Sequence, residues 1–285
     1  MPHNALHDLC FGDTVTAAGI FERLHSDPNA GWEEDGGGCP LHLLCQNEKV
    51  AADMLLAFLQ QSQCSASMMN KKGMTPLHFL CKNKNITAES LMCYLDHAPE
   101  VAYYRESWTE DGACPLHFLC ENQEATAEIL SAFLDHVPEA AAESSKDGYP
   151  LHYLCINQSI TGASLNVLLE STPEAALEKD QLGNCPLHKL CSNESVSAQL
   201  VHILVDCAPE ATTELNVAGQ TPLHTLCESR HVTVEILAAF LDRSPAAAKR
   251  ATSEAFWRGS GLLPLHHRRH RCHRRWRWSQ RRRLR

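Results

Sequence analysis

The motif that decides the fold is Pro-Leu-His-Leu-Leu-Cys at residues 40–45, which recurs five times along the 285-residue chain with one variable position. The later copies occupy residues 76–81, 115–120, 150–155, 186–191 and 222–227. A degenerate copy lies at residues 5–10, and residues 264–266 begin another. Because successive prolines lie 35 to 42 residues apart, we expect stacked units that complete one another's apolar core.

The proline predicts the start of a short first helix in each unit. Its fixed φ suits the first helical turn, and its missing N–H would have no intrahelical partner there. Thr75 and Thr221 precede it as expected N-caps. An asparagine seven residues after the proline is expected to end this helix in the left-handed conformation. It occurs as Asn47, Asn83, Asn122, Asn157 and Asn193.

A second helix is predicted to follow in each unit. A hydroxyl residue eleven positions after the proline reads as its N-cap, at Thr87, Thr126, Thr161, Ser197 and Thr233. In the third unit, Ala88, Leu91, Met92 and Leu95 have the spacing of one apolar helix face. A later proline is expected to stop the helix, at Pro99, Pro138, Pro173, Pro209 or Pro245.

A helix, a tight turn, a second helix and a loop, with Thr-Pro-Leu-His opening the first helix, resemble the ankyrin repeat. The resemblance covers residues 36–245 well and residues 1–35 weakly. It implies an all-α solenoid of about seven helix-turn-helix units. The chain departs from the family pattern by having Leu-Cys in the first helix and Pro-Glu-Ala-Ala in the loop. These departures leave open whether the loops form the family's β-hairpins.

Three segments are expected. Residues 1–35 form a degenerate N-terminal repeat or cap, and residues 36–257 form the repeat array. Residues 258–285 contain eleven arginines and no acidic residue, whereas residues 1–257 carry a net charge of −20. The Arg-rich tail has two interpretations: a disordered nucleic-acid or nuclear-import segment, or an artefact of the gene model, since the last Pro-Leu-His leads directly into it.

The repeated histidines and cysteines could suggest catalysis or metal binding. They are His42, His78, His117, His152, His188 and His224, with a cysteine three residues after each. Presence in every unit argues against a single active site, and the ankyrin resemblance implies a structural histidine that bonds within and between repeats. Two cysteines six residues apart also lack close zinc-ligand spacing. We therefore expect neither an enzyme nor a metal or other cofactor, and free, buried thiols indicate an intracellular, cytoplasmic protein.

Two sets of residues are candidates for binding a partner. The long loop at residues 101–113 carries Tyr103, Tyr104 and Trp108, which are typical of binding hot spots or of aromatics that fasten a loop to its own array. The variable residue after each histidine forms the second set: Leu43, Phe79, Phe118, Tyr153, Lys189 and Thr225. These six positions are expected to form either an exposed ridge or half-buried packing.

The function expected from these features is a scaffold or adaptor that binds a protein partner, with an acidic body that favours basic or mixed-charge partners. The alternative is a nucleic-acid-associated protein that uses the Arg-rich tail and is then nuclear. Neither a membrane span nor a small-molecule substrate is indicated.

Overall fold

The computed structural model describes residues 5–33, 38–106 and 112–244, which form seven consecutive helix pairs. This confirms the predicted all-α, ankyrin-like solenoid. The first helices are α1 (Ala5–Phe11), α3 (Pro40–Gln46), α5 (Pro76–Lys82), α7 (Pro115–Glu121), α9 (Pro150–Ile156), α11 (Pro186–Ser192) and α13 (Pro222–Glu228). The second helices are α2 (Ala17–Ser26), α4 (Ala52–Gln61), α6 (Ala88–His97), α8 (Ala127–His136), α10 (Gly162–Ser171), α12 (Ala198–Cys207) and α14 (Val234–Arg243).

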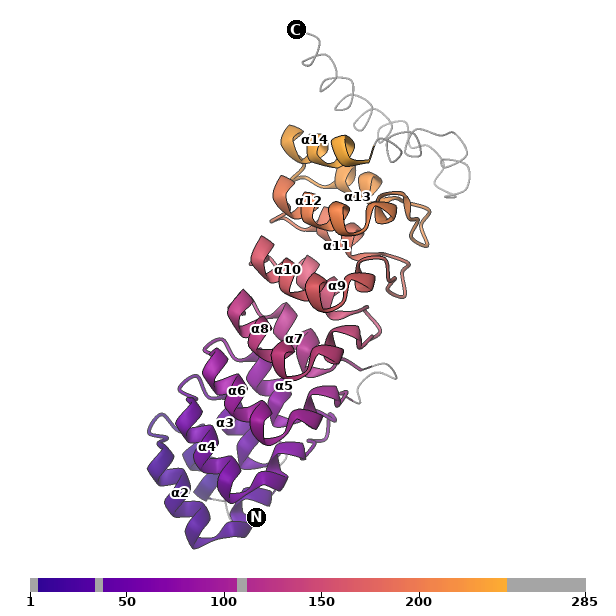
Figure 1. Cartoon of the computed structure of the whole chain (residues 1–285). Helices are drawn as coiled ribbons and strands as arrows, with labels where there is room; N and C mark the ends of the chain where they lie inside the picture. The colour runs from indigo at the N-terminus through magenta and orange to yellow at the C-terminus, as the bar shows by residue number, and fades with distance from the viewer. Residues whose placement is uncertain (1–4, 34–37, 107–111, 245–285) are drawn as a thin grey trace.

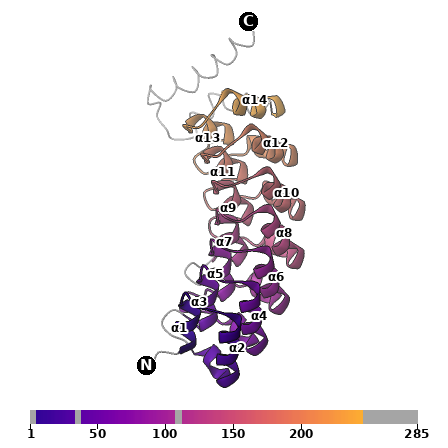
Figure 2. The ribbon, with the colours of Figure 1, turned by 90° about the vertical axis from the view of Figure 1, so that its left-hand side faces the viewer.

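The pairs stack in chain order into one elongated array (Figure 1). First helices pack against the first helices of neighbouring units, and second helices against second helices. Figure 2 shows the two resulting columns, with the first helices on the inner side of a gentle bend. The first helices, which carry the variable position after each histidine, therefore line the concave side.

Prolines shape both ends of the unit. Each first helix from α3 onward has proline at its first position, as predicted. Four second helices end before the proline predicted to stop them, and that proline then opens a short 3-10 helix that the sequence does not predict, while Pro245 lies outside the described residues. These 3-10 helices are η3 (Pro99–Tyr103), η4 (Pro138–Ala142), η5 (Pro173–Ala176) and η6 (Pro209–Thr213), with η1 (Pro28–Trp32) and η2 (Gln63–Ser67) in the earlier units.

The predicted N-caps are confirmed, since Thr87, Thr126, Thr161, Ser197 and Thr233 each accept a hydrogen bond from the backbone N–H three residues on. In α6, Leu91 and Leu95 are buried as expected. Met92 is 38% exposed, so its predicted place in the core is wrong. Tyr94 fills the core instead, and its hydroxyl donates to the carbonyl of Ala66 at 2.8 Å.

The asparagine that ends each first helix is extended, with φ near −70°, so the predicted left-handed conformation is wrong. Its side chain bonds to the preceding unit instead. Asn157 Nδ2 donates to the carbonyls of Cys120 at 2.9 Å and Asn122 at 3.0 Å, and its Oδ1 accepts from Ser159 N at 2.8 Å. Asn47, Asn83, Asn122 and Asn193 repeat this arrangement.

The connecting loops contain no regular strand within the described ranges, and only an isolated bridge joins Ser145 to Gly148. The loops do contain tight turns. In the loop before α5, Asn70 N–H donates to the carbonyl of Met74 at 2.9 Å, and Gly73 closes the turn with φ +70°. A side chain at that φ would be strained, which accounts for glycine. In the described parts of the loops, the open question about hairpins is therefore answered in favour of turns.

The predicted boundaries of the three segments remain predictions. Helices α1 and α2 lie inside the expected N-terminal repeat. Residues 245–257 of the expected array and the whole Arg-rich tail lie outside the described residues.

We predict that Asn157→Ala destabilises the array by about 2–4 kcal/mol, because it leaves buried carbonyls of the preceding unit without their donor. Urea unfolding followed by circular dichroism measures the change. The control is Asn85→Ala, which removes one exposed bond to the carbonyl of Glu48 and should cost under about 1 kcal/mol. Equal losses in the two variants would refute a special contribution from the buried asparagines.

Candidate interaction surface

A row of buried histidines lies beneath the concave surface. In the third unit, His78 Nδ1 accepts a hydrogen bond from Thr75 N at 3.0 Å. Its Nε2 lies 3.4 Å from the carbonyl of Ala113 in the next unit. The other histidines reach the next unit in the same way: His42 to Met74, His117 to Gly148, His152 to Asn184 and His188 to Gln220.

These bonds determine the protonation state. A backbone N–H can only donate, so Nδ1 is the unprotonated acceptor and Nε2 carries the proton that reaches the next unit's carbonyl. Burial lowers the pKa of His78, His117 and His152 to about 4, although the carbonyls that accept from them oppose the shift. His78, His117 and His152 are therefore neutral structural bridges at physiological pH.

The residue after each histidine is half-buried in all six units from α3 to α13, which combines the two readings left open by the sequence. Each aromatic one packs edge-on against the histidine of the preceding unit. Ring centroids are 5.6 Å apart for His42 and Phe79, 5.7 Å for His78 and Phe118, and 4.9 Å for His117 and Tyr153. Each of these aromatic side chains packs with one part against the histidine and is exposed to solvent with the other part.

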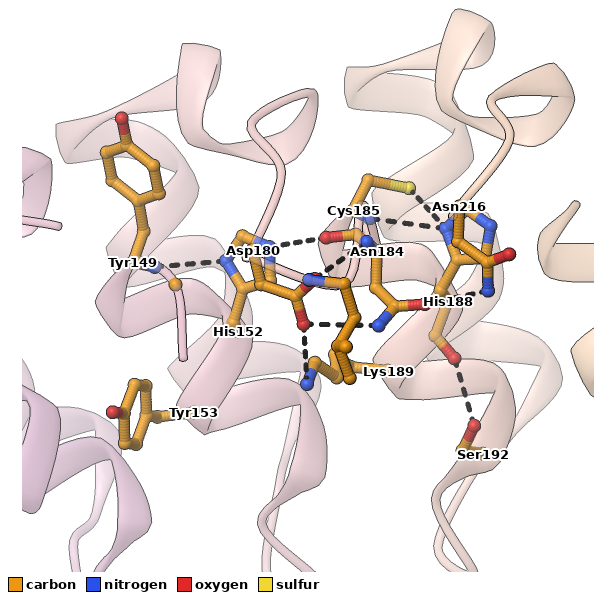
Figure 3. A network of polar contacts seen from close by, with 12 residues as sticks. Tyr149, His152, Tyr153, Asp180, Asn184, Cys185, His188, Lys189, Ser192 and Asn216 are labelled. Carbon is orange, nitrogen blue, oxygen red and sulfur yellow. Dashed lines mark hydrogen bonds and ion pairs between the residues drawn. The ribbon is translucent and has the colours of Figure 1, made fainter. Parts of the chain in front are cut away.

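The row changes from aromatic to cationic at Lys189, for a reason that Figure 3 shows. Lys189 Nζ lies 2.8 Å from Oδ2 of Asp180, whose side chain is only 2% exposed. Asp180 also accepts from Asn184 N at 2.7 Å and from Leu182 N at 2.9 Å. Burial opposes ionisation of this carboxyl, but the bonds from Lys189 and Asn184 outweigh it and hold its pKa below the ordinary value.

The long loop is fastened to the following unit. Tyr103 donates to Glu139 Oε2 at 3.0 Å, and Arg105 pairs with Glu143. Tyr104 is half-buried beside them. Trp108 lies outside the described residues, and a partner-binding function for the three aromatics stays a prediction.

The cysteines of the repeat are buried thiols, from Cys10 to Cys191. Cys114 Sγ lies 3.1 Å from Nδ1 of His117, a distance that would suit an activated nucleophile. Burial instead raises the Cys114 pKa to about 11, so a neutral thiol faces a neutral imidazole. No group of three potential ligands in the described part of the chain is placed to hold a metal ion.

A groove between the second and third units was not anticipated from the sequence. It has a volume of about 750 Å³ and lies between residues 42–48 and 70–84. Leu43 and Phe79 supply apolar walls, and Lys71, Lys72, Lys82 and Lys84 supply charge. Residues 71–84 contain four lysines and no acid, a signal that the strongly acidic total conceals.

Comparison with known proteins bears on the fold alone. No protein-family profile matches the chain, and no curated protein has significant sequence similarity to it. Among solved structures, the ankyrin repeat domain of human ASB11 superposes with a TM-score of 0.60 at 19% identity, covering 84% of this chain and 97% of that one. The array therefore has the ankyrin-repeat fold. No helix in the described ranges is long and apolar enough to cross a bilayer.

We predict that stability falls as the pH decreases from about 6.5 toward 4. The unfolded histidines have a pKa near 6.5, whereas folded His78, His117 and His152 have a pKa of about 4, so the unfolded chain binds more protons within this window. Each histidine contributes up to about 1.4 kcal/mol per pH unit. Urea unfolding at several pH values and histidine NMR titrations measure both quantities.

The test variant is His152→Gln, which should flatten the pH dependence in proportion to one buried histidine. A His152 signal that titrates near 6.5 in the folded chain would contradict the lowered pKa.

We predict that Cys64 and Cys207 are the described thiols that react fastest with a disulfide reagent, because both are exposed. The buried repeat cysteines should react only at the rate of unfolding. Stopped-flow thiol counting on the full chain and on the Cys64→Ser/Cys207→Ser variant tests this. Fast modification of Cys45 or Cys120, located by mass spectrometry, would show that the core is accessible.

Proposed function

We propose that this chain is a non-enzymatic scaffold or adaptor that binds a protein partner on its concave surface. The supporting observation is the row formed by Phe79, Phe118 and Tyr153, in which each ring is fixed by a histidine beneath it and is only half-buried. Rigid aromatics that are partly exposed lose little conformational entropy on binding, which suits them as anchors for a partner.

The chemistry of the repeat favours binding over catalysis. The histidines are neutral and already hydrogen-bonded on both nitrogens, as in His117, and the adjacent thiols are protonated. The same arrangement recurs along the array, without the asymmetry that a reaction centre requires. Thiols that stay reduced in the core support a location inside the cell.

The alternative is nucleic-acid binding through residues 258–285. It rests on composition alone, because this segment lies outside the described residues. It is therefore a competing outcome of the experiment below.

We predict that Phe79→Ala/Phe118→Ala/Tyr153→Ala weakens partner binding about tenfold or more, since interface anchors cost more than about 1 kcal/mol each when truncated. The full chain and its variants are used as bait on nuclease-treated and untreated extracts, and the captured protein is then titrated in purified form. Circular dichroism confirms that each variant remains folded.

The control is Leu56→Ala/Met92→Ala/Val234→Ala, which removes exposed apolar side chains from α4, α6 and α14 on the other column of helices. It should bind within about twofold of the unmodified chain. Capture that requires nucleic acid, disappears at moderate salt and ignores the concave variant would reject the scaffold in favour of the Arg-rich tail.

A further inference from the structure

The lysine-lined groove between α3 and α5 has the opposite charge to the rest of the array. Residues 40–84 contain five lysines and two acidic residues, although residues 1–257 as a whole carry a net charge of −20. The lining residues of the groove come from α3, α5 and the segments beside them, and Figure 2 shows α3 and α5 in the column on the inner side of the bend. The groove therefore forms a local cationic site on an anionic molecule.

Three lysines of this groove, Lys71, Lys82 and Lys84, contrast in their pairing with five cations elsewhere in the described residues. Lys49, Lys179, Lys189, Arg105 and Arg243 each form an ion pair with a carboxylate. No carboxylate of the described residues lies within ion-pairing distance of Lys71, Lys82 or Lys84. Lys82 Nζ instead lies 4.6 Å from the ring centroid of Phe118. Glu48 is the one carboxylate among the residues that line the groove, against four lysines, and this excess of positive charge favours an anionic ligand.

The lysines are also held in place. Lys71 and Lys72 are the two central residues of the turn closed by Gly73, whose N–H donates to the carbonyl of Asn70 at 2.8 Å. Asn70 Oδ1 further accepts from Lys72 N at 2.9 Å and Met74 N at 3.1 Å. Lys84 follows Asn83, which is fixed by its two bonds to the second unit. The backbone that carries these charges is therefore preorganised.

Apolar surface accompanies the charge. Leu43 and Phe79 are half-buried, and both line the groove. Phe79 is fixed edge-on against His42, so its exposed part is a rigid wall. A ligand that only neutralised lysines would not use this wall. The combination suits a segment that carries both carboxylates and an apolar side chain.

We propose that this groove binds a short, extended acidic peptide segment of the partner, with one apolar side chain against Leu43 and Phe79 and carboxylates facing the lysines. The proposal rests on the proposed scaffold function and specifies its ligand chemistry. The total charge of the array favours basic or mixed-charge partners, whereas this groove favours an acidic one. Salt screens charges that lie farther away than the Debye length of about 8 Å, so a ligand bound in the groove interacts mainly with the nearby lysines.

An acidic peptide fits this surface better than a nucleic acid does. The cationic patch is confined to two units, and the array beyond it is acidic. A polynucleotide has phosphates spaced along its whole length, so its flanks would meet repulsive surface. A peptide carries charge only where its sequence places it.

The test uses the full chain and fluorescein-labelled decapeptides in fluorescence anisotropy at physiological salt. One peptide has Asp and Glu around a central leucine, a second has serine in place of the leucine, and a third has the acids replaced by Asn and Gln. We expect saturable binding of the first peptide and at least about fivefold weaker binding of the other two, since a buried apolar side chain contributes about 1.5–3 kcal/mol and loss of charge removes the attraction.

The decisive variant is Lys71→Glu/Lys84→Glu, which should weaken the acidic peptide at least about tenfold. Its control is Lys146→Glu/Arg230→Glu, which changes the net charge by the same amount. Lys146 lies in the connecting loop of another unit, as Lys71 does, and Arg230 lies in the turn between two helices, as Lys84 does. The control should alter binding by no more than about twofold. Both variants retain the Arg-rich tail, so binding to the tail contributes equally to each.

A benzophenone group on the peptide then locates the bound segment. Cross-links to residues near Leu43 and Phe79 support the groove, whereas cross-links confined to residues 258–285 overturn it. Equal losses in the two charge-reversal variants would also overturn it, as would tighter binding of a single-stranded oligonucleotide that depends on Lys71 and Lys84. If a protein is captured through the concave aromatics while the acidic peptide fails to bind, the scaffold function stands and only the groove assignment is lost.

Discussion

The hydrogen bonds of the buried histidine are the interaction on which the rest of the structure depends. One imidazole joins the N-cap of its own first helix to a loop carbonyl of the next unit, as His152 joins Tyr149 to Asn184. Because both ring nitrogens are used, the ring has a single tautomer and a fixed orientation. The proline-initiated helix, the loop and the neighbouring unit are thereby held in register. In three units the aromatic side chain of the following unit also packs on this ring, as Phe118 packs on His78, so the histidine supports both the internal bonding and the surface row.

The units also depend on one another for their apolar core. A seven-residue first helix and a ten-residue second helix are too short to be stable alone in water. Leu77, Leu80 and Cys81 are fully buried only because neighbouring first helices cover them. Because neighbouring units cover the positions of Leu77, Leu80 and Cys81, these three positions are apolar in every unit from α3 to α13. The position after the histidine is only half-buried, so its residue type varies from unit to unit.

Much of this fold is predictable from the sequence, because proline and hydroxyl residues act on their own backbone. Pro76 and Thr87 predict their helix starts correctly for that reason. Predictions fail where a distant unit decides. Asn157 is extended because carbonyls of the preceding unit engage its amide, and Met92 is exposed because the packing of neighbouring second helices selects Tyr94 instead. The groove is missed similarly, since Leu43 and Lys84 become neighbours only when two units stack.

The bridges between units have a direction. Histidines donate toward the following unit and asparagines toward the preceding one, so each junction among the first six units presents one face of each kind, whereas Ser229 replaces the asparagine in the seventh. A junction made by joining any two of the first six units thus has the same complementary faces as the original. Duplication or deletion of one complete unit in the gene preserves all remaining junctions, whereas a change by part of a unit does not. The array can accordingly change its length in evolution by whole units, while each unit's surface residues diverge independently.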